Sequence, residues 1–404
     1  MKRTILGFIF SVIAIVCFGS KAIETFVSDC GIDSESSSVV VIDLETGAWI
    51  ENYNSNLSLL PASVMKAVTI GSLINETGID YVYETKVYLQ GEQQDSTYVG
   101  NLIIESCGDP SLNSIYEPLT ADFVAECVAG IKLKGIKKFK GEVKFVNEVF
   151  GGPSVPPSWD PADLKYGYGA GCFDFNFENN SYFKGNQSYS IKKPSKLFVD
   201  RFVSLLSTIG IDFEEVKSPK LPKKRELLVN HRSATIDDIM RSCMMRSDNL
   251  FAEALLKTYA LVVTNSKGTT EEGAKKEKAY WESKGLKTTG CKFVDGSGLS
   301  RQNRLTASFL ASMLQKMSDN VDYVSFFPLA GQDGTLQKFL KDTPLDSYIA
   351  LKTGSMRGVQ CYAGYKLDED YAPTHVVVIM INNFKERNKI KKASEELLLE
   401  IFNN

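Results

Sequence analysis

Short apolar runs near both ends of the chain, the first of which begins with alternating polar positions, have the pattern of β-strands. Strands are expected at residues 37–44, 49–53, 348–352, 359–367 and 375–382. Helical periodicity marks residues 63–75, ended by Gly78, and the C-terminal residues 389–402. Two opening strands and three closing strands predict one antiparallel sheet, built from both chain ends and packed between helices in an α/β (α+β) fold.

The periodicity changes character between residues 79 and 230. Short β-like runs, separated by glycine and proline turns, are expected at residues 86–89, 101–105 and 141–146, and helices at 122–134 and 197–209. Helical patterns then resume at residues 237–245, 250–263 and 270–284. We therefore predict an inserted α/β domain, residues 79–230, between the two parts of a discontinuous main domain, residues 23–78 and 231–404.

The N-terminal residues have the pattern of a secretion signal. Lys2 and Arg3 precede an apolar run over residues 5–18, and Ser20-Lys21-Ala22 offers small residues for cleavage. This pattern predicts a signal peptide at residues 1–22 and export across the inner membrane to the periplasm. An uncleaved membrane anchor is the alternative, although the apolar run is short for a spanning helix.

Composition excludes several kinds of function. The formal net charge of −3 gives no basic face for nucleic acid. Of the eight cysteines, Cys17 falls in the signal, which leaves an odd number and no C-x-x-C pair. Neither a zinc site nor a complete disulfide framework is therefore indicated, although one or two disulfides would be compatible with an oxidising compartment, and no cofactor is expected. Of the two histidines, His375 opens a strand and His231 has no obvious Asp partner. A Ser-His-Asp mechanism is therefore poorly supported, and an activated serine needs another base.

A serine and a lysine three residues apart supply that alternative. Ser63 and Lys66 stand at the start of a predicted helix, on one of its faces. The helix N-terminus favours developing negative charge beside the serine. Lys66 has apolar neighbours, and burial together with the charge of Lys352 would lower its pKa enough for it to act as a base. The alternative is that both residues lie on the surface at a helix start and have no catalytic role.

Two later triplets fit the same chemistry. Ser247-Asp248-Asn249 precedes an apolar helix, where it could simply cap the helix. Functionally, Ser247 could relay a proton to a leaving amine and Asn249 could bind both Lys66 and a peptide. The run Lys352-Thr353-Gly354-Ser355 is expected to end a strand and enter a turn over residues 354–358, either as a plain hairpin or as a strand edge that binds an extended peptide and its carboxylate. The backbone N–H groups of Ser63 and Ser355 would form the oxyanion hole.

Serine with lysine at i+3, Ser-x-Asn and Lys-Thr-Gly, in this order, are the signature of serine acyl-transfer enzymes that act on D-alanyl peptides or β-lactams. The sequence resembles the D-alanyl-D-alanine carboxypeptidases/endopeptidases of the class C low-molecular-mass penicillin-binding proteins, of the penicillin-binding protein 4 type. Further matching runs are Pro61-Ala62-Ser63, Gly108-Asp109-Pro110-Ser111-Leu112, Ser247-Asp248-Asn249-Leu250-Phe251-Ala252-Glu253, Asp295-Gly296-Ser297-Gly298-Leu299-Ser300-Arg301 and Gly331-Gln332-Asp333-Gly334-Thr335-Leu336. The resemblance implies a penicillin-recognising, β-lactamase-like fold, with a domain inserted between the first two motifs.

The resemblance also implies a substrate pocket. In the family, an acid and an aromatic residue on the inserted domain face the amino end of diaminopimelate, and the matching positions here are Asp163 and Tyr168. Arg301 matches an arginine near the same pocket. Two departures are visible: a third nested domain is reduced or absent after residue 177, and Arg357 occupies a turn position where relatives can carry a neutral residue.

The expected function is a D-Ala-D-Ala carboxypeptidase, a DD-endopeptidase or both, acting on peptidoglycan stem peptides through an acyl-enzyme on Ser63 and inhibited by β-lactams. A β-lactamase of the same fold is one alternative. It would need a deacylating glutamate, and the acids near residues 271–282 lack the Glu-x-x-Leu-Asn pattern. A non-catalytic cell-wall sensing module is the other alternative. The sequence gives no oligomeric state.

Overall fold

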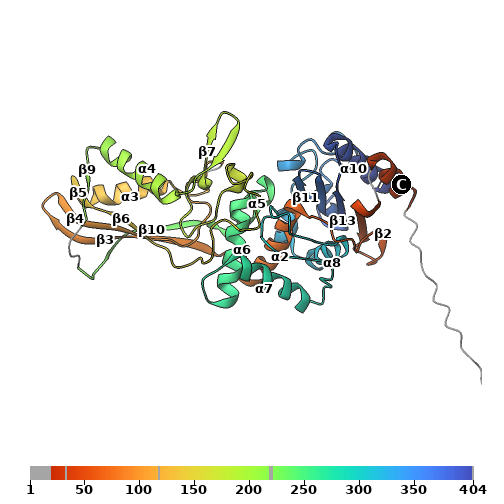
Figure 1. Cartoon of the computed structure of the whole chain (residues 1–404), viewed down its shortest axis with the longest axis horizontal. Helices are drawn as coiled ribbons and strands as arrows, with labels where there is room; N and C mark the ends of the chain where they lie inside the picture. The colour runs from red at the N-terminus through yellow and green to blue at the C-terminus, as the bar shows by residue number, and fades with distance from the viewer. Residues whose placement is uncertain (1–19, 32–33, 117–118, 218–221, 403–404) are drawn as a thin grey trace, which may run out of the picture.

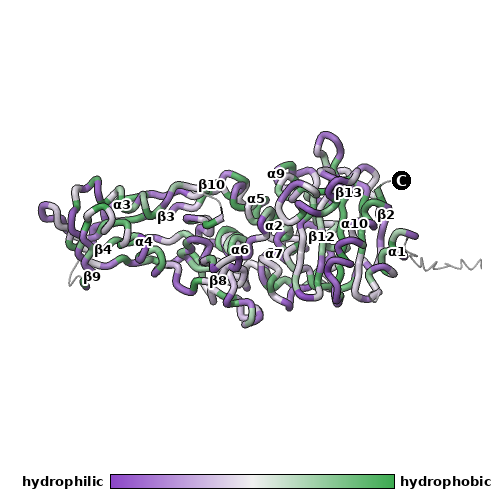
Figure 2. The backbone as a smooth tube through the Cα atoms, turned by 90° about the horizontal axis from the view of Figure 1, so that it is seen from above, coloured by the Kyte–Doolittle hydropathy of each residue, from purple (hydrophilic) through white to green (hydrophobic). Residues whose placement is uncertain are grey.

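Two separate sheets lie toward opposite ends of an elongated molecule (Figure 1). The structure, a computed structural model, describes residues 20–31, 34–116, 119–217 and 222–402. Seen from above, the two parts again lie end to end, joined through the region of helices α2 (Met65–Thr77), α5 (Ile236–Arg246) and α6 (Asn249–Thr264) (Figure 2).

The first sheet is antiparallel and has the strand order β11-β12-β13-β1-β2. Its strands are β1 (Ser37–Asp43), β2 (Trp49–Tyr53), β11 (Ile349–Met356), β12 (Val359–Leu367) and β13 (Pro373–Asn382). Ser37 lies opposite Ile381, so strands from the two ends of the chain pair directly. The predicted single antiparallel sheet and the α/β fold class are therefore confirmed.

Helices cover both faces of this sheet, because its strands carry apolar side chains on both sides. Val40, Val378 and Met380 point into one core, shared with helices α2, α5, α6, α7 (Thr270–Ser283) and α8 (Ala307–Met317) and with the short helix α9 (Val321–Ser325). Val39 and Val377 point into the other core, shared with α1 (Lys21–Cys30) and α10 (Arg387–Phe402). Helix α8 was not predicted from the sequence.

The expected signal peptide falls mostly outside the described residues. Its last positions open α1, where the Ser20 hydroxyl accepts from the N–H of Ile23. Ala22 is already buried in the core beside α10. In the described part of the chain, no helix combines the length and apolar character that crossing a membrane requires.

The second sheet has the order β10-β3-β4-β5-β9, with β6 also paired to β4. Its strands are β3 (Val82–Gln94), β4 (Thr97–Glu105), β5 (Lys138–Gly141), β6 (Val143–Val146), β9 (Asp212–Glu215) and β10 (Glu226–Thr235). Helices α3 (Phe123–Leu133) and α4 (Pro194–Thr208) pack on it around an aromatic core. Because β10 runs to Thr235, this sheet extends past residue 230. Residues 181–190, before α4, form the hairpin β7 (Ser181–Lys184) and β8 (Gln187–Ser190).

His231 has an acidic partner that the sequence did not reveal. Its Nδ1 lies 2.7 Å from Glu126 Oε2, and the ring packs edge-on against Phe123. These contacts connect β10 to α3 within the second sheet, because sequence-distant residues become neighbours when the helix packs on the strand. The partner is a glutamate, not the aspartate of a Ser-His-Asp triad, and the pair supports the packing of α3 on β10.

The cysteines of the described residues are all free thiols, and they are Cys30, Cys107, Cys127, Cys172, Cys243, Cys291 and Cys361. All but Cys107 are buried, as small apolar side chains usually are. No group of three or more potential metal ligands occurs within the described ranges.

Candidate active site

Ser63 stands in a tight turn that two glycines hold in place. It lies in the 3-10 turn Ala62–Val64, directly before α2, and Ala62 has a positive φ of 47°. A Cβ at Gly354 would come within 2.4 Å of the Pro61 carbonyl oxygen and 3.0 Å of the Ser63 nitrogen. A Cβ at Gly298 would come within 1.9 Å of the Ala62 carbonyl oxygen. Both positions therefore need glycine, because backbone packs directly on the serine turn.

Lys66 places its amine between three acceptors. Its Nζ donates to Ser63 Oγ at 2.9 Å, to Asn249 Oδ1 at 2.6 Å and to the Ser297 carbonyl oxygen at 2.8 Å. The side chain is fully buried, and this burial lowers the pKa of Lys66 below its ordinary value. Carboxylates nearby, among them Asp248, oppose the effect. A buried amine with a lowered pKa, in contact with a serine hydroxyl, is the arrangement expected of a serine activated by a lysine base.

A second buried lysine lies across the site. Lys352 Nζ donates to Ser247 Oγ at 2.9 Å and to the carbonyl oxygen of Thr353 at 2.9 Å. Burial and then the positive charge of Lys66 lower the pKa of Lys352 well below its ordinary value. Two lysines that repel each other in one buried site therefore favour the state in which at least one amine is neutral.

The triplet Ser247-Asp248-Asn249 both caps a helix and lines the site. Asp248 is the N-cap of α6, and its Oδ1 accepts from the N–H of Phe251 at 3.1 Å. Ser247 has a left-handed backbone with φ of 59°, which turns the chain so that its hydroxyl reaches Lys352. The capping interpretation and the functional one therefore apply to different residues of the same triplet.

The run Lys352-Thr353-Gly354-Ser355 lies within a strand, not at its end. Strand β11 continues to Met356 and pairs with β12 as far as Met356 opposite Val359. The turn is the two-residue link of Arg357 and Gly358, and Gly358 supplies the positive φ of 73°. The predicted turn over residues 354–358 was wrong, because the glycine at 354 accommodates the Ser63 turn and does not bend the strand. Thr353 Oγ1 lies 2.7 Å from Thr335 Oγ1.

A buried carboxylate connects the inserted region to this site. Asp295 accepts hydrogen bonds from the N–H groups of Gly298 and Ser300 and from the indole N–H of Trp159 at 2.8 Å. Asn249 Nδ2 donates to the Tyr168 carbonyl oxygen at 2.8 Å. The segment with Trp159 and Tyr168 is therefore fixed against the same elements that hold Lys66.

Asp163, Tyr168 and Arg301 lie with Ser63 around one cleft of about 1230 Å³. The Tyr168 hydroxyl donates to Asp163 Oδ1 at 3.0 Å, and both side chains are close to the surface. Arg301 donates to the carbonyl oxygen of Arg357 at 3.3 Å from one guanidinium nitrogen and at 3.4 Å from the other. Arg357 and Lys385 also line the cleft. The cleft thus offers a ligand two carboxylates, those of Asp160 and Asp163, and the cations of Arg301, Arg357 and Lys385.

No glutamate lines this cleft among the described residues. The buried Glu277 instead accepts from the hydroxyl of Ser72 at 3.1 Å. Ser72 lies six residues after Lys66 on α2, about 9 Å further along the helix. Glu277 is therefore held against α2 and does not line the cleft of Ser63, which agrees with the missing glutamate pattern in the sequence.

Glu253 is a residue that the analysis of the sequence missed as a site component. Its Oε1 accepts from the N–H groups of Gly296 at 3.1 Å and Ser297 at 2.9 Å, so it holds the residue whose carbonyl accepts from Lys66. Burial, followed by the charge of Asp295, raises the pKa of Glu253 to about 8. Its place in the matching run Leu250-Phe251-Ala252-Glu253 was the only signal available.

Replacing Glu253 by leucine is expected to slow acylation of Ser63 by penicillin ~10- to 100-fold, because two buried N–H groups lose their acceptor at ~1–3 kcal/mol each and the Ser297 carbonyl shifts. Glu253→Gln keeps a carbonyl acceptor and is expected to retain most of the rate. Stopped-flow acylation of both variants, compared at equal folded fraction by circular dichroism, measures this. Equal rates in a folded Glu253→Leu variant would contradict a positioning role.

A serine turn, a buried lysine pair and a Ser-x-Asn loop around one cleft define a serine acyl-transfer enzyme with a lysine base. The sequence profile of the D-Ala-D-Ala carboxypeptidase 3 (S13) family matches residues 20–184 and 179–400, and the chain belongs to this family of serine peptidases.

Individual relatives agree with this assignment. The chain is 25% identical over 385 residues to D-alanyl-D-alanine carboxypeptidase DacB of Haemophilus influenzae, with 78% of this chain and 79% of the relative covered. It is 24% identical over 423 residues to a D-alanyl-D-alanine carboxypeptidase of Actinomadura sp., with 85% and 77% covered.

Solved structures share the fold. The crystal structure of penicillin binding protein 4 (dacB) from Haemophilus influenzae aligns with a TM-score of 0.81 at 22% identity, covering 95% of this chain and 99% of that one. The Bd0816 predatory endopeptidase from Bdellovibrio bacteriovorus, solved with immunity protein Bd3460, aligns with a TM-score of 0.62 at 14% identity, covering 91% and 93%.

Proposed function

We propose that this peptidase cleaves peptide bonds that follow a D-alanine in peptidoglycan stem peptides, as a D-Ala-D-Ala carboxypeptidase and DD-endopeptidase. The observation that carries the proposal is the amine of Lys66, held at 2.9 Å from the Ser63 hydroxyl in a buried site. Two of the relatives above are named D-alanyl-D-alanine carboxypeptidases, which supports the substrate. β-Lactams, which resemble this peptide, would acylate the same serine.

In the proposed first step, neutral Lys66 takes the proton of the Ser63 hydroxyl as its oxygen attacks the carbonyl carbon of the D-Ala-D-Ala bond. The N–H groups of Ser63 and Ser355 stabilise the oxyanion, at ~3–4 kcal/mol per donor. Lys352, through the hydroxyl of Ser247, passes a proton to the departing amine. The C–N bond breaks, and the acyl group stays on Ser63.

Before the second step, the proton that Lys66 took from Ser63 replaces the one that Lys352 gave to the amine, so Lys66 is neutral again. Water then attacks the ester carbonyl carbon while Lys66 accepts one of its protons. Lys66 returns this proton to the Ser63 oxygen as the ester C–O bond breaks, which releases Ser63. Asn249 keeps the amine of Lys66 aligned through its 2.6 Å contact and binds the peptide backbone. Thr353 and Ser355 bind the terminal carboxylate of the substrate along β11, and Gly354 lets the backbone approach the serine turn.

We assign substrate selection to the inserted region, residues 79–230, and the chemistry to residues 23–78 and 231–404. Asp163 and Tyr168 would bind the amino end of diaminopimelate, and Arg301 would bind its carboxylate. Such a substrate places the enzyme in the periplasm, and the N-terminal signal pattern supports export.

Incubation with labelled penicillin, and separately with muropeptides that end in D-Ala-D-Ala, tests this function. A long-lived covalent adduct and release of D-alanine are the expected results. Rapid turnover of penicillin would instead indicate a β-lactamase, and the absence of both reactions would indicate a non-catalytic module.

Replacing Asp163 by alanine is expected to lower kcat/KM on diaminopimelate-containing peptides by ~10- to 100-fold, the effect of losing one charge-assisted hydrogen bond. Penicillin acylation of the same variant should stay within about twofold, because penicillin lacks that amino group. The two rates are measured side by side on one preparation. Equal losses on both substrates would remove Asp163 from substrate recognition.

A further inference from the structure

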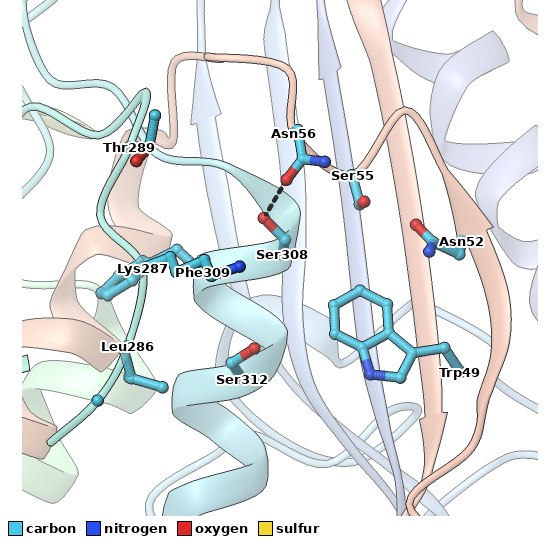
Figure 3. A pocket seen from close by; sticks show the side chains of 11 residues that line it. Trp49, Asn52, Ser55, Asn56, Leu286, Lys287, Thr289, Ser308, Phe309 and Ser312 are labelled. Carbon is cyan, nitrogen blue, oxygen red and sulfur yellow. Dashed lines mark hydrogen bonds between the residues drawn. The ribbon is translucent and has the colours of Figure 1, made fainter. Parts of the chain in front are cut away.

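A second cavity lies away from the cleft of Ser63, at the other edge of the first sheet. It has a volume of about 460 Å³ and is bounded by β2, α8 and the loop at residues 285–289 (Figure 3). Strand β2 is one edge of the sheet and β11 is the other. Because neighbouring strands lie about 4.8 Å apart, the two edges are separated by about 19 Å. No residue lines both cavities.

The cavity combines one accessible indole with uncharged polar side chains. Trp49, 37% exposed, projects from β2 toward the α8 side of the cavity (Figure 3). Carboxamides and hydroxyls make up most of the remaining wall, namely those of Asn52, Ser55, Asn56, Thr289, Ser308 and Ser312. Leu286 and Phe309 supply apolar surface, and Lys287 is the one charged residue of the lining. The lining contains no carboxylate.

Hydrogen bonds hold the walls of this cavity in place before any ligand binds. Ser308 Oγ donates to Asn56 Oδ1 at 2.9 Å, and the N–H of Ser308 donates to the Ser55 carbonyl oxygen at 2.8 Å. Because Asn56 uses its oxygen in this way, its Nδ2 remains directed away from Ser308 (Figure 3). Across the described ranges, the side chains of Trp49, Asn52 and Ser312 have no hydrogen-bond partner.

These features match the chemistry of a neutral sugar. A pyranose ring has an apolar C–H face that stacks on an indole, while hydroxyls around its edge exchange hydrogen bonds with carboxamides and hydroxyls. An acetamido substituent adds an amide that can exchange hydrogen bonds with Asn52 and Asn56, and a methyl group that can pack on Leu286 and Phe309. A cationic ligand would find no carboxylate here, and a strongly anionic ligand would find a single lysine.

We propose that the Trp49 cavity binds a neutral glycan of N-acetylated amino sugars. The binding itself does not depend on the peptidase activity; the proposed function enters only in naming the glycan strand of peptidoglycan as its source. A polymeric substrate would then contact the protein twice, by a sugar segment at β2 and by a stem peptide at β11.

Titration of the full chain with the β-1,4-linked tetramer of N-acetylglucosamine tests the binding. Of the three tryptophans, Trp159 and Trp281 are 4% and 1% exposed, so a change in fluorescence reports mainly on Trp49. A saturable change with a Kd on the order of 1 mM or below is expected. No saturable change up to about 10 mM would overturn the proposal.

Two variants separate the cavity from the rest of the strand. Trp49→Ala removes the indole, and Asn52→Ala removes a carboxamide while the fluorescent reporter stays. Ile50→Ala is the matched control, because Ile50 is the next residue of β2, is 47% exposed and does not line the cavity. Calorimetry should show at least ~10-fold weaker binding for the first two variants and unchanged binding for the control. A tenfold change in Kd corresponds to the loss of about 1.4 kcal/mol of binding free energy. Equal binding by all three folded variants would refute the site.

Turnover then shows whether the cavity serves the enzyme. D-Alanine release from intact peptidoglycan should fall for Trp49→Ala, whereas release from a soluble stem pentapeptide should match that of the unaltered protein. If the unaltered protein releases no D-alanine, the proposed function fails, while the glycan titration still decides on the cavity. Equal loss on both substrates would contradict a glycan contact and indicate a structural effect.

Discussion

Ser63→Ala is expected to abolish covalent labelling by penicillin and to lower release of D-alanine by on the order of 10⁶-fold, the loss seen when a serine nucleophile is removed from a comparable peptidase. The physical reason is the absence of any other hydroxyl at 2.9 Å from the amine of Lys66 among the described residues. Mass spectrometry of the intact protein after incubation with penicillin measures the adduct directly.

The fold should survive this substitution. Lys66 keeps its contacts with Asn249 and with the Ser297 carbonyl, so the buried amine is not left without acceptors. Thermal unfolding of the variant should therefore follow that of the unaltered protein. An adduct of normal yield on a folded Ser63→Ala protein would show that another residue is the nucleophile.

Lys66→Arg is the second large effect that we expect, with acylation slowed ~10²- to 10⁴-fold, the usual contribution of a general base. Arginine keeps the positive charge and most of the volume, but its pKa above ~12 leaves no neutral form to accept the proton of Ser63. Rates of acylation by penicillin at several pH values measure the loss. Acylation at the normal rate would exclude Lys66 as the base.

The pH dependence of the unaltered protein gives an independent check. The reactive form of Lys66 is the neutral amine, whose fraction rises with pH through the pKa. Burial lowers that pKa from the ordinary lysine value of 10.5, so the rise in acylation rate should be complete at a lower pH than for an exposed lysine. The Lys66→Arg variant should lack this rise. A rate that climbs only near pH 10.5 would indicate an unperturbed amine.

Local patterns in the sequence predicted much of the fold. The apolar runs along residues 37–44 and 375–382 predicted strands that the structure has as β1 and β13. The runs are nearly continuous because both faces of the sheet are covered. Helix α8 was missed although Thr306 caps it and residues 309, 310, 313, 314 and 317 are apolar at helical spacing. The turn at residue 354 was misplaced, because the pattern does not reveal that Gly354 is needed for close packing.

The candidate site could be predicted only in part. Ser63 in the 3-10 turn and Lys66 in the first turn of α2 are three residues apart in consecutive helical segments, so spacing predicts their contact. The contact of Lys66 with Asn249 spans 183 residues and depends on the packing of α2 against α6. The acceptor at Ser297 is a backbone carbonyl, which any residue type provides, so no side-chain pattern could identify it. Glu253 acts by holding Ser297, so its role could not be predicted without knowing that the Ser297 carbonyl is an acceptor for Lys66.

The pairing of β1 with β13 has a consequence for the order of folding. Ser37 meets Ile381 only after nearly the whole chain has been synthesised. The second sheet, by contrast, draws all of its strands from residues 82–235 and can close before the C-terminal residues leave the ribosome. Such long-range pairing makes folding slow. A newly made chain therefore passes through a stage in which its second sheet is complete but its first sheet is not. At this stage β11, the strand that contains Lys352, has no sheet to join.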